Sequence, residues 1–148
     1  MTPNPPSTAA ALSRVLGPLR RAVLRATRSA AGLPDLADPH IEMLRVVADQ
    51  PGISPNAIAT QLRLARPTVS NSMQTLRHAG LITVRHSEAD SRRVHVSLTR
   101  RAEHLLGRYD AVSEEILTAA LDKLTPTERA AVAAALPALS KLQITLTS

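Results

Sequence analysis

Arginine is concentrated in one stretch of this 148-residue sequence. Residues 60–108 contain nine arginines and three acidic residues, which accounts for the whole formal net charge of +6. A guanidinium group donates pairs of hydrogen bonds from a planar fork, and this geometry suits phosphate oxygens and the edges of nucleic-acid bases. A solvated basic surface is the alternative interpretation, and charge alone leaves both open.

A polar surface without acidic residues is predicted on a helix over about residues 66–79. Val69, Met73 and Leu76 recur at i, i+4 and i+7, which indicates the buried face of that helix. Amide side chains can pair with adenine in the major groove, and arginine can pair with guanine. The residues on the opposite face are therefore candidate base contacts, with an ordinary solvated face as the alternative: Pro67, Ser70, Asn71, Gln74 and Arg77.

A short helix before this one completes a helix-turn-helix pattern. Ser54 and Pro55 combine an N-cap residue with proline at the first helical position, so we expect a helix from there to about Leu62. The tight link of residues 63–65 ends in an alanine, which offers no capping side chain to the following helix. Backbone N–H groups at the two helix starts, near Ser54 and Arg66, would point at phosphates.

The apolar periodicity then changes from helical to alternating. Residues 81–85 and 93–98 are rich in β-branched residues and flank the polar loop 86–92, a pattern that predicts a β-hairpin with a charged tip. An arginine on such a tip can reach the minor groove of DNA, where the negative potential is strongest. Arg85 and Arg93 suit phosphate contacts and plain strand-edge charges equally well.

Amphipathic helices are expected before this region. The first runs through residues 12–26, and Pro18 should kink or restart it because proline removes a backbone donor. A second helix should begin with Asp38 as its N-cap and Pro39 in its first position. Residues 32–34 should end the first helix.

Two more helices are expected after the hairpin. Thr99 should cap a long helix over about residues 100–123. Thr125 and Glu128 form a capping box that starts the last helix, in which Pro137 should produce a kink. The predicted fold class is therefore mostly α with a small β-hairpin wing, a winged helix-turn-helix.

Several function classes find no support in the composition. The chain has no cysteine, so disulfides and thiolate chemistry are excluded. We find no signal-peptide pattern and no uncharged apolar run long enough to span a bilayer, so we expect a soluble cytoplasmic protein with no membrane partner. No glycine-rich phosphate loop, HExxH pattern or Ser/His/Asp order indicates an enzyme.

A metal site is one interpretation of the cluster formed by Asp35, Asp38, His40 and Glu42. The favoured interpretation is that acids at a helix start complement the helix dipole. We therefore predict no metal and no cofactor.

Short motifs across residues 38–106 resemble those of the MarR (multiple antibiotic resistance regulator) family of bacterial repressors. The most specific combination is an Asp-x-Arg hairpin tip ahead of a Val-Ser-Leu-Thr helix start. The motifs are Ala57-Ile58-Ala59 with Leu62, Pro67-Thr68-Val69-Ser70, Gly80-Leu81-Ile82 after Leu76, Asp90-Ser91-Arg92-Arg93 and Val96-Ser97-Leu98-Thr99.

This resemblance implies a homodimer that binds a pseudo-palindromic double-stranded DNA operator, with a recognition helix in each of two major grooves. It implies that Arg92 enters the minor groove, and that Asp90 pairs with an arginine and holds the wing in shape. It also implies release from DNA by a small-molecule effector, frequently phenolic or anionic, which makes the protein a repressor.

The domain organisation expected on this basis has four parts. Residues 1–8 are a disordered tail, and residues 9–37 are an N-terminal dimerisation helix. Residues 38–100 form the DNA-binding domain, with the wing at 81–98, and residues 101–148 complete the dimerisation region.

The predicted DNA-binding residues come from both helices of the helix-turn-helix and from the wing. Two alternative hypotheses for the function are a winged-helix module that binds proteins and an architectural protein that binds DNA without sequence preference. The full predicted set is Ser54, Asn56, Arg66, Pro67, Thr68, Ser70, Asn71, Gln74, Arg77, Arg85, Asp90, Arg92 and Arg93.

Overall fold

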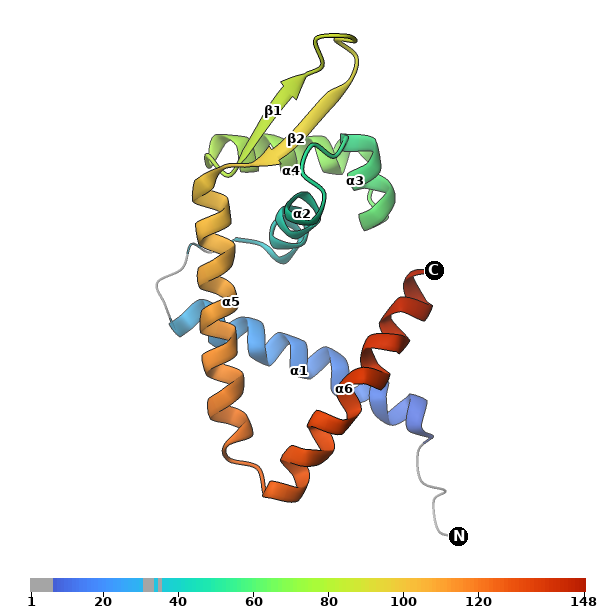
Figure 1. Ribbon diagram of the computed structural model, residues 1–148, viewed down its shortest axis with the longest axis vertical. Coiled ribbons are helices and arrows are strands. Elements are labelled where there is room, and N and C mark those ends of the chain that lie inside the picture. Colours follow the sequence, from blue (N-terminus) through green and yellow to red (C-terminus); the bar gives the residue numbers. More distant parts are fainter. Residues whose placement is uncertain (1–6, 31–33, 35) are drawn as a thin grey trace. The chain divides into compact units, whose positions relative to one another are not determined.

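The fold is a set of six helices and one two-stranded hairpin among the residues described by the computed structural model, which are 7–30, 34 and 36–148 (Figure 1). Part of the tail predicted over residues 1–8 and part of the helix stop predicted over residues 32–34 lie outside these residues. In chain order the elements are α1 (Thr8–Ala30), α2 (Asp38–Asp49), α3 (Pro55–Leu62), α4 (Arg66–His78), β1 (Ile82–His86), β2 (Val94–Leu98), α5 (Arg100–Leu121) and α6 (Pro126–Thr147).

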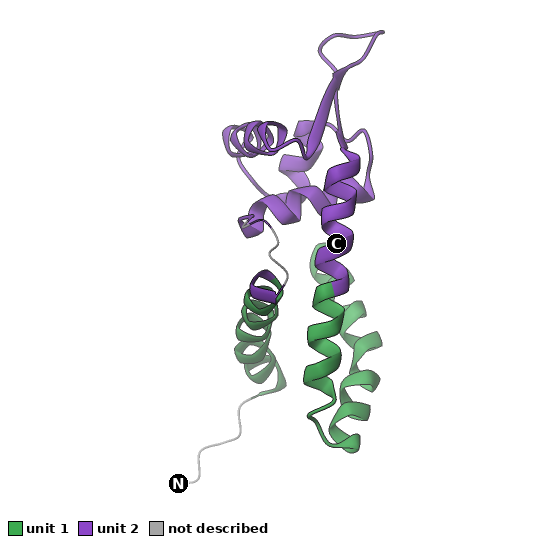
Figure 2. Cartoon of the chain, turned by 90° about the vertical axis from the view of Figure 1, so that its left-hand side faces the viewer, with its two compact units in different colours: residues 1–27, 112–148 green, residues 28–111 purple. Residues whose placement is uncertain are grey.

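The chain divides into two compact units, coloured separately in Figure 2. One unit is residues 28–111, which hold the helix-turn-helix and the hairpin. The other unit combines residues 1–27 with residues 112–148. Helices α1 and α5 each cross the division, so each contributes residues to both units.

The unit of residues 28–111 has an aliphatic core. Leu44 of α2, Ile58 of α3, Leu76 of α4 and Val96 of β2 are completely buried and belong to one cluster. Tyr109 of α5 joins them with 3% of its surface exposed, and its hydroxyl donates a 2.6 Å hydrogen bond to the carbonyl oxygen of Pro34. Burial of these side chains holds α2, α3, α4 and the hairpin around one core.

The predicted hairpin is confirmed, with strand bounds within one residue of those expected. β1 and β2 are antiparallel, and Val84 lies opposite Val96 in their register. Val96 also bridges to Ile53, in the turn between α2 and α3, so the base of the hairpin is tied to the residues that precede α3.

Two left-handed residues shape the turns at either end of α4. Arg63 has φ 52° and ψ 44°, and this conformation closes the link between α3 and α4. Gly80 has φ +72° and directs the chain from α4 into β1. A side chain at Gly80 would be strained, because only glycine adopts this region at little cost.

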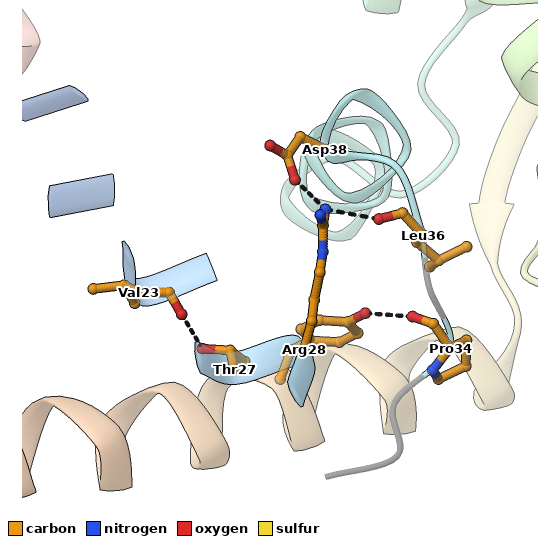
Figure 3. Close-up of polar contacts among 7 residues, drawn as sticks. Val23, Thr27, Arg28, Pro34, Leu36 and Asp38 are labelled. Atoms are coloured by element: carbon orange, nitrogen blue, oxygen red, sulfur yellow. Dashed lines mark hydrogen bonds and ion pairs between the residues drawn. The ribbon is translucent and has the colours of Figure 1, made fainter. Parts of the chain in front are cut away.

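The predicted N-cap of α2 is wrong. Ala37 occupies the N-cap, Asp38 is the first residue of the helix and Pro39 is the second. The carboxylate of Asp38 is instead paired with the guanidinium of Arg28, which also donates to the carbonyl oxygen of Leu36 at 2.8 Å (Figure 3). The Asp38 carboxylate, which the local sequence pattern assigned to the N-cap of α2, therefore forms an ion pair with a residue of α1 instead.

Neither internal proline ends its helix. α1 continues through Pro18 and α6 continues through Pro137. Of the two outcomes expected at Pro18, a kink or a restart, the restart does not occur. A proline removes one backbone donor, but the hydrogen bonds of the neighbouring turns remain available to continue the helix.

The predicted capping box of α6 is confirmed, because Thr125 Oγ1 accepts from Glu128 N at 3.2 Å and Glu128 Oε2 accepts from Thr125 N at 2.9 Å.

The helices of the other unit expose apolar side chains. No residue of α6 is buried, and α1 exposes Val15, Leu16 and Leu19. By length and composition alone α6 could also cross a bilayer, with mean hydropathy 1.3. The sequence predicted no membrane span because no uncharged apolar run is long enough. In α6, Lys141 interrupts the apolar run.

Replacement of Leu76 by alanine should lower the free energy of unfolding by about 2–5 kcal/mol, because this side chain is fully buried beneath α4. Chemical denaturation followed by circular dichroism measures the change. The matched control is Gln74→Ala on the exposed side of the same helix, which should change stability by less than about 0.5 kcal/mol. Equal losses for the two variants would contradict the assigned burial of α4.

Candidate nucleic-acid interface

The outer face of α4 is polar and exposed. Val69, Ser72 and Leu76 are buried on the inner face, and the predicted outward residues, from Arg66 to Arg77, are all exposed. Pro67, Asn71, Gln74 and His78 follow the i, i+4, i+7, i+11 spacing, which places them in one line opposite the buried side. His78 was absent from the sequence prediction, although the same spacing, continued by one turn, identifies it.

The turn between α3 and α4 sets the orientation of this face. Ser54 caps α3, and its Oγ accepts a 3.1 Å hydrogen bond from Ala57 N. Leu64, in the link, donates from its backbone N to the carbonyl oxygen of Ala59 at 3.0 Å and packs against the core. Ala65 at the N-cap of α4 offers no side-chain hydrogen bond, so the prediction of a weakly capped start is confirmed.

Backbone contacts hold the tip of the wing. Arg92 N donates to Asp90 Oδ1 at 3.0 Å, and Arg93 N donates to Asp90 O at 2.9 Å. His86 Nδ1 lies 3.0 Å from the carbonyl oxygen of Ser91, and Ser87 N donates to Arg93 O at 2.9 Å. This tight turn fixes the backbone positions of the two tip arginines.

The family resemblance implies that Asp90 pairs with an arginine side chain. In the structure the carboxylate of Asp90 makes a different contact. Within the described part of the chain, Asp90 makes no ion pair with an arginine, and its carboxylate accepts from the Arg92 backbone N–H. A short side chain two residues before an amide forms this turn readily. Asp90 therefore does hold the tip in shape, through the backbone.

One hollow of about 390 Å³ brings together residues from three separate segments. Ser54 and Asn56 come from the start of α3, Arg66 comes from the start of α4, and Arg92 and Arg93 come from the wing. None of its lining residues is acidic, and the other lining residues are Gly52, Pro55, Val94 and His95.

A second hollow, of about 690 Å³, lies along α4 and the first strand of the wing. Ser70, Gln74 and Arg77 line it together with Met73, His78 and Val84. The two hollows thus gather eight of the thirteen predicted residues. The remaining five line neither hollow, and all five are exposed: Pro67, Thr68, Asn71, Arg85 and Asp90.

The electrostatics of this surface are positive. The sequence from Gln50 to Ser87, which includes α3, α4 and β1, contains no Asp or Glu. Among the described residues, Arg66, Arg92 and Arg93 have no acidic side chain within ion-pair distance. These guanidinium groups are therefore available for anionic oxygens from outside the chain.

The described residues bring no three His, Cys, Asp or Glu side chains together as a metal-binding group. Of the acidic cluster considered from the sequence, Asp35 lies outside those residues and Asp38 is paired with Arg28.

A helix-turn-helix with an exposed polar second helix, followed by a two-stranded wing, defines a winged helix-turn-helix protein. Comparison with known proteins agrees with this assignment of the fold. The MarR family model matches residues 32–93. Over that segment the chain is similar to the MarR family.

The sequence is similar to transcriptional regulator HosA of Escherichia coli O157:H7, with 34% identity over 89 residues. That match covers 57% of this chain and 66% of HosA, just under two thirds of the relative.

Solved structures share the fold over nearly the whole chain. RV1404 from Mycobacterium tuberculosis has a TM-score of 0.77 and 17% identity, covering 93% of this chain and 96% of its own. Streptococcus pneumoniae FabT in complex with DNA has a TM-score of 0.70 and 20% identity, covering 92% of this chain and 97% of its own.

Replacement of Asp90 by alanine should loosen the wing tip, because the Arg92 amide loses its acceptor. Amide hydrogen exchange by NMR should show faster exchange at Arg92. Asp90→Asn retains an acceptor oxygen and should restore protection, and Glu88→Ala should leave the Arg92 amide unchanged. Unaltered exchange in Asp90→Ala would show that this carboxylate does not hold the turn.

Proposed function

We propose that this chain is a homodimeric, sequence-specific, double-stranded DNA-binding transcriptional repressor that a small-molecule ligand releases from its operator. Such a protein acts in the cytoplasm, where it has access to the chromosome.

The observation that carries this proposal is the acid-free outer face of α4 together with the arginine-lined hollow next to it. A helix of this kind fits the major groove, and a wing with arginines at its tip suits the adjoining backbone and minor groove. FabT, which shares the fold, has been solved in complex with DNA. The same mode of binding is what we propose for this chain.

Each residue has a proposed role. Asn71 and Gln74 read base edges in the major groove, while Thr68 and Ser70 contact phosphates. Arg92 enters the minor groove. The remaining contacts to the DNA backbone and groove edges come from Ser54, Asn56, Arg66, Pro67, Arg77, Arg85 and Arg93, with Asp90 holding the wing tip.

A homodimer accounts for the exposed apolar face of α6. Val132, Leu136, Leu139 and Leu142 follow helical spacing on one side of α6, and each exposes 38% or more of its surface. Lys141 lies on the opposite side, as expected of a helix whose apolar stripe packs against a second copy. This charge pattern favours a dimer interface over a membrane span, for which α6 qualifies by length and composition alone.

The rival functions have less support. A protein-binding winged helix would present an apolar or acidic recognition face, and α4 presents neither. A non-specific architectural protein would use Lys and Arg along the helix, whereas α4 offers Asn71 and Gln74. The regulator names of the family and of HosA point away from an enzyme.

The experiment that tests this proposal is a fluorescence-anisotropy titration onto the protein's own promoter duplex and onto a scrambled duplex, across salt concentrations. A sequence-specific regulator should bind the promoter much more tightly, with a salt slope of about 0.9 for each phosphate contact. Equal affinity for both duplexes would support the alternative of an architectural protein that binds DNA without sequence preference. Absence of binding at low salt would overturn the DNA-binding proposal.

Variants in the same assay separate the two kinds of contact. Arg92→Ala should weaken binding to both duplexes and lower the salt slope by about 0.9. Asn71→Ala and Gln74→Ala should mainly lower the preference for the promoter, by about 1–3 kcal/mol for each lost base contact. If Asn71→Ala and Gln74→Ala each weaken both duplexes equally, neither residue reads bases.

Replacement of Leu136 by glutamate should shift the protein toward monomers, because the charge would lie in the apolar stripe of α6. Analytical ultracentrifugation measures the shift in the dissociation constant, expected to exceed about tenfold. Lys141→Glu, on the opposite side of the same helix, is the matched control and should remain dimeric. A dimer of unchanged stability in Leu136→Glu would place the interface elsewhere.

A further inference from the structure

His95 is a histidine of the wing that the predicted DNA-binding set did not include. It lies on β2 opposite Arg85 of β1, and it lines the hollow formed with Arg66, Arg92 and Arg93. Its Nδ1 lies 3.0 Å from the carbonyl oxygen of Gly52, in the turn before α3. The residue as a whole is exposed. His95 is therefore both anchored to the fold and accessible from the hollow.

The partner of Nδ1 determines the protonation pattern of the ring. A carbonyl oxygen can only accept a hydrogen bond, so Nδ1 carries a proton and donates it to Gly52 O. In the neutral ring the second nitrogen, Nε2, then holds a lone pair and cannot donate. When the ring takes up a second proton, Nε2 becomes a charged donor. The bond to Gly52 is the same in both states.

The groups that face His95 are cationic. Arg66, Arg92 and Arg93 line the same hollow, and Arg85 is the register partner on β1. The start of α3 adds Ser54 and Asn56, which are neutral, and no lining residue is acidic. A negatively charged oxygen in this hollow would meet the guanidinium groups of Arg66 and Arg93 and the ring of His95, which is the donor set expected for a phosphate.

We propose that this hollow binds one backbone phosphate of the bound DNA, and that His95 contacts this phosphate only when its imidazole is protonated. The inference rests on the proposed function and adds to it a dependence on pH. The neutral ring directs a lone pair at the phosphate, whereas the charged ring donates a hydrogen bond from Nε2. Histidine is the side chain whose charge changes near neutral pH, so this contact is lost as the pH rises. Binding of DNA takes up a proton, and affinity increases as the pH falls.

The test compares the wild type with two variants, using the promoter duplex labelled with a pH-insensitive dye, from about pH 5.5 to about pH 8.5. His95→Arg carries a permanent charge, and His95→Gln carries none. At the acidic end the wild type should match His95→Arg, and at the alkaline end it should match His95→Gln. The change should be about tenfold or more in affinity, as expected for a hydrogen bond to a charged group.

Two further readouts separate a phosphate contact from a structural effect. The salt slope of the wild type should fall by about 0.9 per protomer between the acidic and alkaline ends, while the slopes of both variants stay constant. His104→Gln, an exposed histidine on α5 that does not line the hollow, should keep the wild-type pH profile. Thermal melts followed by circular dichroism verify that each variant is folded.

A pH profile of His95→Gln parallel to that of the wild type would overturn the inference, and so would a salt slope that does not change with pH. In either case the proposed function stands, because the wild type still binds its promoter. Absence of promoter binding by the wild type at every pH overturns the proposed function itself, and the His95 contact with it.

Discussion

The short β-bridge between Ile53 and Val96 is the contact on which the geometry of the binding surface depends. Gly52 N donates to Val96 O and Val96 N donates to Ile53 O, both at 2.9 Å, and both apolar side chains are buried in the core. These bonds fasten the base of the wing to the residues that precede α3. The hairpin of β1 and β2 follows this bridge (Figure 1). Arg92 and Arg93 line one hollow together with residues from the starts of α3 and α4.

Much of this architecture could be predicted because its signals are local. Ser54 followed by Pro55 marks the start of α3, and Thr125 with Glu128 marks the start of α6, since caps depend on residues within one helical turn. The change from helical to alternating periodicity located the hairpin to within one residue. The outer face of α4 could be identified for the same reason, because helical spacing alone separates it from Val69 and Leu76.

Contacts between distant residues could not be predicted in this way. Asp38 has the sequence context of an N-cap, and its actual partner is Arg28 on another helix. His95 has the context of an exposed strand residue, and the carbonyl that orients its ring lies 43 positions earlier. The hollow is assembled from three segments whose proximity follows from packing of the core. Residue type predicted most of the groups in the surface, and tertiary structure determined which of them share a hollow.

The aliphatic composition of the core leaves the protein with a single intrinsic optical probe. The chain has one tyrosine, no tryptophan and no phenylalanine, so Tyr109 alone absorbs and emits near the usual protein wavelengths. Its ring is buried and its hydroxyl is bonded to Pro34 O, just before α2. Tyrosine emission from this chain is therefore a site-specific signal, free of background, that reports on the junction between α5 and the segment leading into α2.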